Sequence, residues 1–260
     1  MTTRPAAVAN LFYPGEAEAL RSQVQAALSR APATGVVPKA IVVPHAGYVY
    51  SGDVAARAYA QLQPAHARIH RVLLLGPCHR VPLHGLAAPQ AEAFETPLGR
   101  VAVDRAAIDS LLKLPQVQLF DLTHQQEHSL EVQLPFLQQV LDDFRIVPLV
   151  VGEASAGEVR QVLDALWGGE ETLIVVSSDL SHYHDYDSAR QKDAATCRAI
   201  ESLQGEAIDY DSACGRNPLL GLLAAARDRN MQVTTLDLRN SGDTAGNRDR
   251  VVGYGAWMFV

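Results

Sequence analysis

The sequence has few cysteines, no long apolar run and no excess of basic residues. Its three cysteines are Cys78, Cys197 and Cys214. Three is an odd and small number, so these cysteines do not form a disulfide framework. Each is either a small apolar core residue or a chemically active thiol. No apolar segment reaches the roughly 18 residues that cross a membrane, and the N-terminal residues lack the apolar stretch of a secretory signal. We therefore expect a cytoplasmic protein that enters no membrane.

The charge balance excludes another class of protein. The formal net charge is −7, whereas a general nucleic-acid binder presents a basic face. No repeat, low-complexity segment or flexible linker divides the 260 residues, and 48% of them are apolar. We therefore expect residues 1–260 to form a single domain with a sizeable core.

Apolar runs alternate with helical patterns along the chain. Strands are predicted at 40–43, 71–75, 85–88, 100–103, 145–151, 173–176, 233–238 and 251–259, and a polar loop at 92–99. Helices are predicted at 16–31, 53–62, 104–112, 129–141 (with a kink or late start at Pro135), 156–167, 187–203 and 218–228. This alternation is typical of an α/β fold with a mixed or mostly parallel central sheet and helices on both faces. Ligands bind such folds beyond the carboxyl ends of the strands.

Histidines follow three of these strands. His45 comes after the strand at 40–43, His79 after 71–75, and His182 after 173–176 together with Asp179. Any one of them would be an ordinary loop residue, but three at one sheet edge predict a site. Imidazoles from different strands suit a transition metal. The third ligand could be Asp179, Glu131 or a cysteine.

A second pair of polar residues lies outside these strand ends. His128 and Glu131 are three residues apart, so they would share one face of a helical turn. They could contribute to the site, or they could simply mark the start of a helix. Cys78 is interpreted as packing, because a strand residue next to His79 points to the opposite side.

Eight stretches carry a wider resemblance. They are FYPG (12–15), PHAGYVYSG (44–52), LGPCHRVPL (75–83), TPLG (96–99), EHSLEVQLPF (127–136), VPLVVG (147–152), SSDLSHY (177–183) and ACGRNPLLG (213–221). In this order they resemble the Memo family, whose bacterial and archaeal members are called AmmeMemoRadiSam system protein B. The resemblance implies a fold like that of the LigB class of extradiol ring-cleaving dioxygenases, which use non-haem iron.

The resemblance also implies a set of site residues. His45, His79 and Cys214 would bind the metal, Asp179 and His182 would lie beside it, and His128 and Glu131 nearby. Ring-cleaving relatives complete their iron site with a carboxylate. Cys214 would supply a softer thiolate, which favours copper, iron or zinc.

These residues support one leading hypothesis and two alternatives. In the first, an iron- or copper-dependent, dioxygenase-like oxidoreductase acts on an unknown small substrate. His182 would be its general acid or base, and Asp179 or Glu131 would orient a histidine. Tyr48 and Arg216 could contact substrate, or each could equally be structural. The alternatives are a non-enzymatic binding or scaffold protein that uses the pocket for a peptide or anionic partner, and a zinc hydrolase. The resemblance further implies AmmeMemoRadiSam system protein A and a radical-SAM protein as partners.

Overall fold

The computed structural model describes residues 2–260, and its strands join into one twelve-stranded mixed sheet. The strands are β1 (Thr3–Arg4), β2 (Ala40–Val43), β3 (Arg71–Pro77), β4 (Leu86–Ala88), β5 (Ala93–Thr96), β6 (Gly99–Val103), β7 (Val117–Leu119), β8 (Arg145–Val151), β9 (Thr172–Ser177), β10 (His182–His184), β11 (Val233–Asn240) and β12 (Val251–Phe259). The longest hydrogen-bonded path runs β1-β5-β6-β8-β3-β9-β2-β12-β10. Its centre, β8-β3-β9-β2, is parallel, and β12 joins β2 antiparallel.

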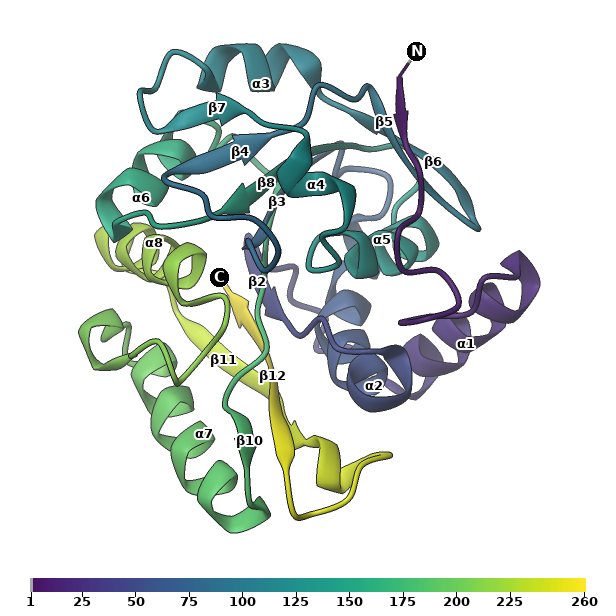
Figure 1. Cartoon of the computed structure of the whole chain (residues 1–260), viewed down its shortest axis with the longest axis vertical. Coiled ribbons are helices and arrows are strands. Elements are labelled where there is room, and N and C mark those ends of the chain that lie inside the picture. The colour runs from purple at the N-terminus through teal and green to yellow at the C-terminus, as the bar shows by residue number, and fades with distance from the viewer. Residues whose placement is uncertain (1) are drawn as a thin grey trace.

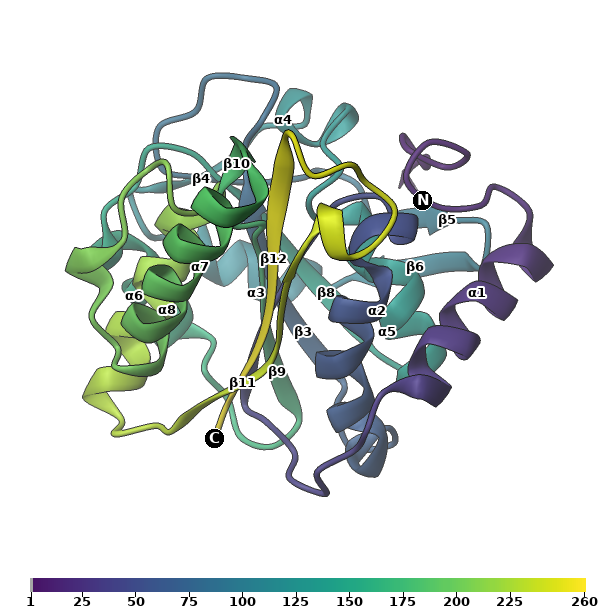
Figure 2. The ribbon, with the colours of Figure 1, turned by 90° about the horizontal axis from the view of Figure 1, so that it is seen from below.

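Helices cover the sheet on both faces (Figures 1 and 2). They are α1 (Ala17–Arg30), α2 (Tyr48–Tyr59), α3 (Arg105–Leu111), α4 (Leu122–Gln125), α5 (Leu134–Val140), α6 (Ala156–Ala165), α7 (Tyr186–Glu201) and α8 (Arg216–Asp228). Short 3-10 turns are η1 (Ala60–Ala65), η2 (Glu131–Gln133), η3 (Gly205–Ala207) and η4 (Ser241–Asp243). Figure 2 shows α6, α7 and α8 on one side of the strands and α1, α2 and α5 on the other. The prediction of an α/β fold with a mixed sheet between helices is confirmed.

The order of the central strands sets the position of the site. β9 lies between β2 and β3 and pairs in parallel with both. All residues of β2 and β9 are buried, which is why both read as uninterrupted apolar runs. Their carboxyl ends therefore open at one edge of the sheet, and so does that of β3. His45 and His79 follow the two outer strands of this trio, on either side of Ser177 at the end of β9.

A helix and a loop are among the predicted elements that differ from the structure. The helix expected at 53–62 begins at Tyr48, because the Tyr48 backbone N–H donates to Phe12 and its hydroxyl to Val132, contacts that outweigh a weakly helical sequence. The polar loop expected at 92–99 contains β5, which pairs with β6 and with the N-terminal strand β1. Among residues 2–260, no helix is long and apolar enough to cross a membrane.

Candidate metal centre

Three imidazoles meet at this edge of the sheet. His45, His79 and His128 each offer a ring nitrogen, and these atoms lie within 4.8 Å of one another. The ring centroid of His45 lies 5.2 Å from that of His79 and 5.4 Å from that of His128. The rings of His79 and His128 are stacked, with their centroids 4.7 Å apart. Imidazole nitrogens at such spacing are a common donor set for iron, copper and zinc.

A hydrogen bond to the Ser177 hydroxyl at the end of β9 fixes the His45 ring. Its Nδ1 lies 2.8 Å from the Ser177 hydroxyl oxygen. That hydroxyl has one proton, which it donates to the Ser129 carbonyl at 2.7 Å, and it accepts from Gln133 Nε2 at 2.9 Å. His45 Nδ1 must therefore carry a proton and donate it, which leaves the lone pair on Nε2. Burial lowers the pKa of His45 well below its usual value, so the ring is neutral and available as a ligand.

A carboxylate orients the second imidazole. Glu127 accepts from His79 Nδ1 at 2.9 Å and from the His79 backbone N–H at 2.7 Å. Burial alone would raise the pKa of Glu127, but the hydrogen bonds and charge of His79 outweigh it and bring the pKa to about 2. An ionised carboxylate only accepts, so His79 Nδ1 donates, and Nε2 is the ring nitrogen left to face a metal. Metal-binding histidines in general are held by such a second hydrogen bond.

His128 lies between two rings. His79 stacks on it, and Phe12 contacts it with a centroid distance of 4.6 Å. Its Nδ1 is buried without a hydrogen-bond partner among residues 2–260, and the nearest carboxylate oxygen, on Glu127, is 3.5 Å away. Burial lowers the pKa of His128 to about 4, so this ring is also neutral at pH 7. A buried imidazole nitrogen without a partner is costly, and a bound cation would satisfy it.

Cys214 lies beside the group of three histidines and contacts one of them. Its sulfur lies 3.3 Å from His45 Nε2 and accepts a hydrogen bond from the Asp179 backbone N–H at 3.3 Å. Burial raises the pKa of the Cys214 thiol, so without a metal the S–H can donate to the lone pair of His45. Asp179 contacts both residues, since its carboxylate also accepts from the His45 backbone N–H at 2.7 Å. Burial raises the pKa of Asp179 to about 7.

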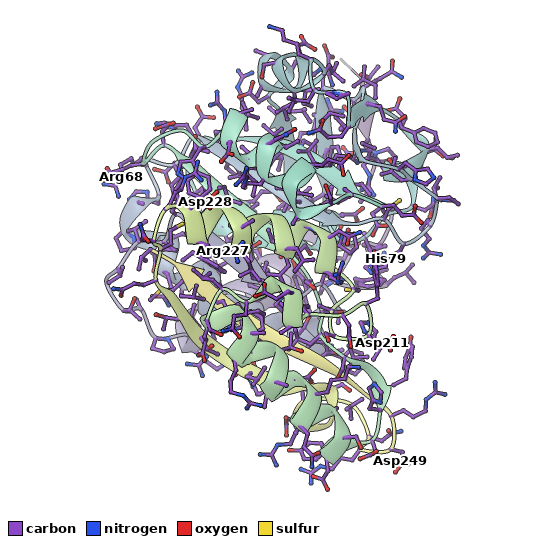
Figure 3. The ribbon with its side chains drawn as sticks, turned by 90° about the vertical axis from the view of Figure 1, so that its left-hand side faces the viewer. Arg68, His79, Asp211, Arg227, Asp228 and Asp249 are labelled. Atoms are coloured by element: carbon purple, nitrogen blue, oxygen red, sulfur yellow. The ribbon has the colours of Figure 1, made fainter. Side chains whose placement is uncertain are left out.

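A cavity of about 730 Å³ opens above these groups. Its lining residues are His45, His79, Arg80, His128, Asp179, His182, Tyr183, His184, Tyr210, Asp211 and Cys214. In Figure 3, His79 and Asp211 lie along the same edge of the molecule, whereas Arg227 and Asp228 mark the far end of α8. Burial lowers the pKa of His182, which therefore stands neutral in the cavity wall.

Glu131 has a different role in the structure. Its carboxylate is fully buried and pairs with Arg4. It also accepts from the backbone N–H of Ala7 at 2.8 Å and of Val8 at 3.0 Å, and from the Tyr13 hydroxyl at 2.5 Å. These contacts fix the N-terminal segment, and Glu131 does not line the cavity.

The structure thus brings six of the seven sequence-predicted site residues to one cavity. His45, His79, His128, Asp179, His182 and Cys214 all line it. Sequence reasoning missed Ser177 and Glu127, which hold the imidazoles. Glu127 stands next to His128 in the chain, but the histidine whose Nδ1 it holds is His79, a contact that no local spacing reveals.

Comparison with known proteins shows the family of the chain. A family model described as Memo-like protein matches residues 4–258. MEMO1 family proteins from Aquifex aeolicus and Ignicoccus hospitalis are 37% and 36% identical, the first covering all of both chains and the second all of this chain and 99% of the relative. The crystal structure of uncharacterized protein JW3007 from Escherichia coli K12 covers 86% of this chain and 100% of that one, with a TM-score of 0.55 and 16% identity, which shows a shared fold alone. The chain therefore belongs to the family of Memo-like proteins.

Proposed function

We propose that the chain is a metal-dependent oxidoreductase that holds one iron or copper ion in this cavity and oxidises a small molecule with O2. The observation that carries the proposal is the convergence of three imidazoles, with a thiol sulfur 3.3 Å from Nε2 of one of them. His45 presents a lone pair on Nε2, hydrogen bonding of Nδ1 leaves Nε2 of His79 facing the site, and the buried Nδ1 of His128 has no hydrogen-bond partner among residues 2–260. When bound, a redox metal would supply electron transfer and Lewis-acid activation.

The residues of the chain would bind the substrate and move protons. His182 lines the cavity as a neutral imidazole, and a neutral imidazole accepts a proton at pH 7. Glu127 and Ser177 keep the ligand rings in one tautomer, so that no reorientation is needed when a ligand binds. Tyr210 and Tyr183 form walls of the cavity against which a small aromatic molecule could pack.

Metal analysis of anaerobically purified protein tests the proposal. We expect stoichiometric iron or copper in the wild type and a loss of at least tenfold in His79→Ala and Cys214→Ser. His84→Ala is the matched control, since His84 pairs with Glu153 on the surface and is 87% exposed. Unchanged metal content in His79→Ala would contradict the proposal.

The identity of the metal separates the two enzyme hypotheses. Zinc also accepts histidine and cysteine ligands, so stoichiometric zinc would favour a hydrolase. Absence of any metal would favour a binding or scaffold protein. The cytoplasmic location, system protein A and the radical-SAM partner stay predictions.

A further inference from the structure

A second cavity adjoins the first. It encloses about 590 Å³ and shares four lining residues with the candidate metal centre: His128, Asp179, His182 and Tyr183. Away from them, its walls come from the segment at Phe12, the start of α2, the loop after η4 and the strand β12. A ligand in this cavity would therefore reach His128 and His182 from the side.

The walls of the second cavity are unusually aromatic for this chain. Phe12, Tyr50, Tyr183 and Tyr254 all line it, although only 6% of the sequence is aromatic. Tyr183 and Tyr50 remain 64% and 39% exposed, so the protein itself does not cover these rings. The backbone of Tyr183 has φ 64°, a left-handed conformation that is costly for such a residue.

One cation faces these rings. The Arg250 guanidinium lies 5.0 Å from the centroid of the Tyr183 ring, and among residues 2–260 its side chain forms no hydrogen bond or ion pair. Asn247 orders the turn before it by accepting from the Asp249 backbone N–H at 3.2 Å. Asp249 lies on the same side of the molecule as His79 and Asp211 (Figure 3). The one carboxyl group that lines this cavity is Asp179, at the end shared with the metal centre.

We propose that the second cavity binds a small aromatic carboxylate, with its ring against Tyr50 and Tyr183 and its carboxylate on Arg250. This inference rests on the proposed function, because the aromatic carboxylate would be the substrate of the proposed oxidoreductase or an analogue of that substrate. A guanidinium that stacks on a ring keeps its N–H donors free at its edge, and their fork matches the two oxygens of a carboxylate. A single guanidinium balances one negative charge, which fits a carboxylate better than a phosphate dianion.

Two isosteric probes and two variants test this inference. Benzoate and benzamide have the same size and ring, but only benzoate is charged. Their dissociation constants are measured by ligand-observed NMR titration on metal-free protein, so a failure of the metal proposal leaves the result intact. Arg250→Gln is compared with Arg248→Gln, because Arg248 comes from the same loop as Arg250 but does not line the cavity. The Arg248 guanidinium instead lies 4.3 Å from the ring centroid of Tyr186.

We expect wild type and Arg248→Gln to bind benzoate about tenfold more tightly than benzamide, since a charge-assisted pair contributes on that order. Arg250→Gln should abolish the preference, and Tyr50→Ala should weaken both probes. Equal affinity for the two probes in the wild type would overturn the inference. So would an unchanged preference in Arg250→Gln, or the same loss in both arginine variants.

Discussion

Glu127 determines the orientation of one candidate ligand and lies close to another. One carboxylate oxygen accepts from His79 Nδ1 and from the backbone N–H groups of His128 and Ser129, each at 2.9 Å. The sequence predicts His45, His79 and His182 because they follow apolar strands. It cannot predict Glu127 in this role, since His79 lies far away in the chain and only the turn before η2 brings the two together.

Replacing Glu127 with glutamine keeps the shape of the side chain and removes its charge. Residues that hold a ligand histidine in this way typically contribute 10- to 100-fold to metal affinity, so we expect a loss of about that size in Glu127→Gln. Competition with a chelator measures it. Glu153→Gln, which removes the partner of exposed His84, should leave the affinity unchanged. Equal affinities in both variants would show that Glu127 has no such role.

The N-terminal segment is held in place by buried charge. Arg4, 6% exposed, pairs with Glu131 and donates to the carbonyls of His124 at 2.8 Å and Glu127 at 2.7 Å. These contacts join β1 to the segment that carries His128. The three-residue spacing from His128 suggested Glu131 as a site residue. Its actual partners lie more than 100 residues away in the sequence, so no local pattern could reveal them.

Removal of Arg4 should destabilise the fold strongly. In Arg4→Met, Glu131 keeps its buried charge without the guanidinium, and breaking such pairs costs about 3–5 kcal/mol of unfolding free energy. Arg30→Met breaks the exposed Arg30–Asp53 pair and should cost under about 1 kcal/mol. Urea unfolding compares the two. Similar losses would mean that the buried pair contributes no more than a surface one.

The elements that sequence patterns predict well are those with their own periodicity. The strand at 251–259 has the bounds that the pattern gives, and α1 differs from its prediction by one residue at each end. Short elements such as β5, β7 and β10 escape prediction, because pairing with distant strands rather than local preference creates them.

For the whole molecule, buried imidazoles couple stability to pH. Burial lowers the pKa of His124 to about 4, whereas in the unfolded chain it is near the usual 6.5. Between these values the unfolded state binds more protons. The contribution of His124 is thus complete above pH 6.5 and is lost as the pH falls toward 4, by about 3 kcal/mol. Asp179, whose pKa is raised from the usual 3.8 to about 7, acts in the opposite direction over this whole range.

A variant separates the contribution of His124 from that of Asp179. His124→Gln can still donate to the Ala87 carbonyl, which His124 Nε2 contacts at 3.0 Å, but it does not titrate. Between pH 7.5 and 4.5 the unfolding free energy of the wild type should fall by about 2–3 kcal/mol more than that of the variant. Urea curves at both pH values measure this difference. Parallel pH dependences would contradict it.

The order of strands in the sheet has a consequence for co-translational folding. The candidate donors come from positions 45, 79, 128 and 214, and β2, which leads into His45, pairs with β9 and β12. A nascent chain therefore cannot complete the pairing of β2 until β9 and β12 have left the exit tunnel. No two donors are neighbours in the sequence, so an unfolded or truncated chain offers only isolated, weak ligands. Metal binding would then report that the sheet has formed.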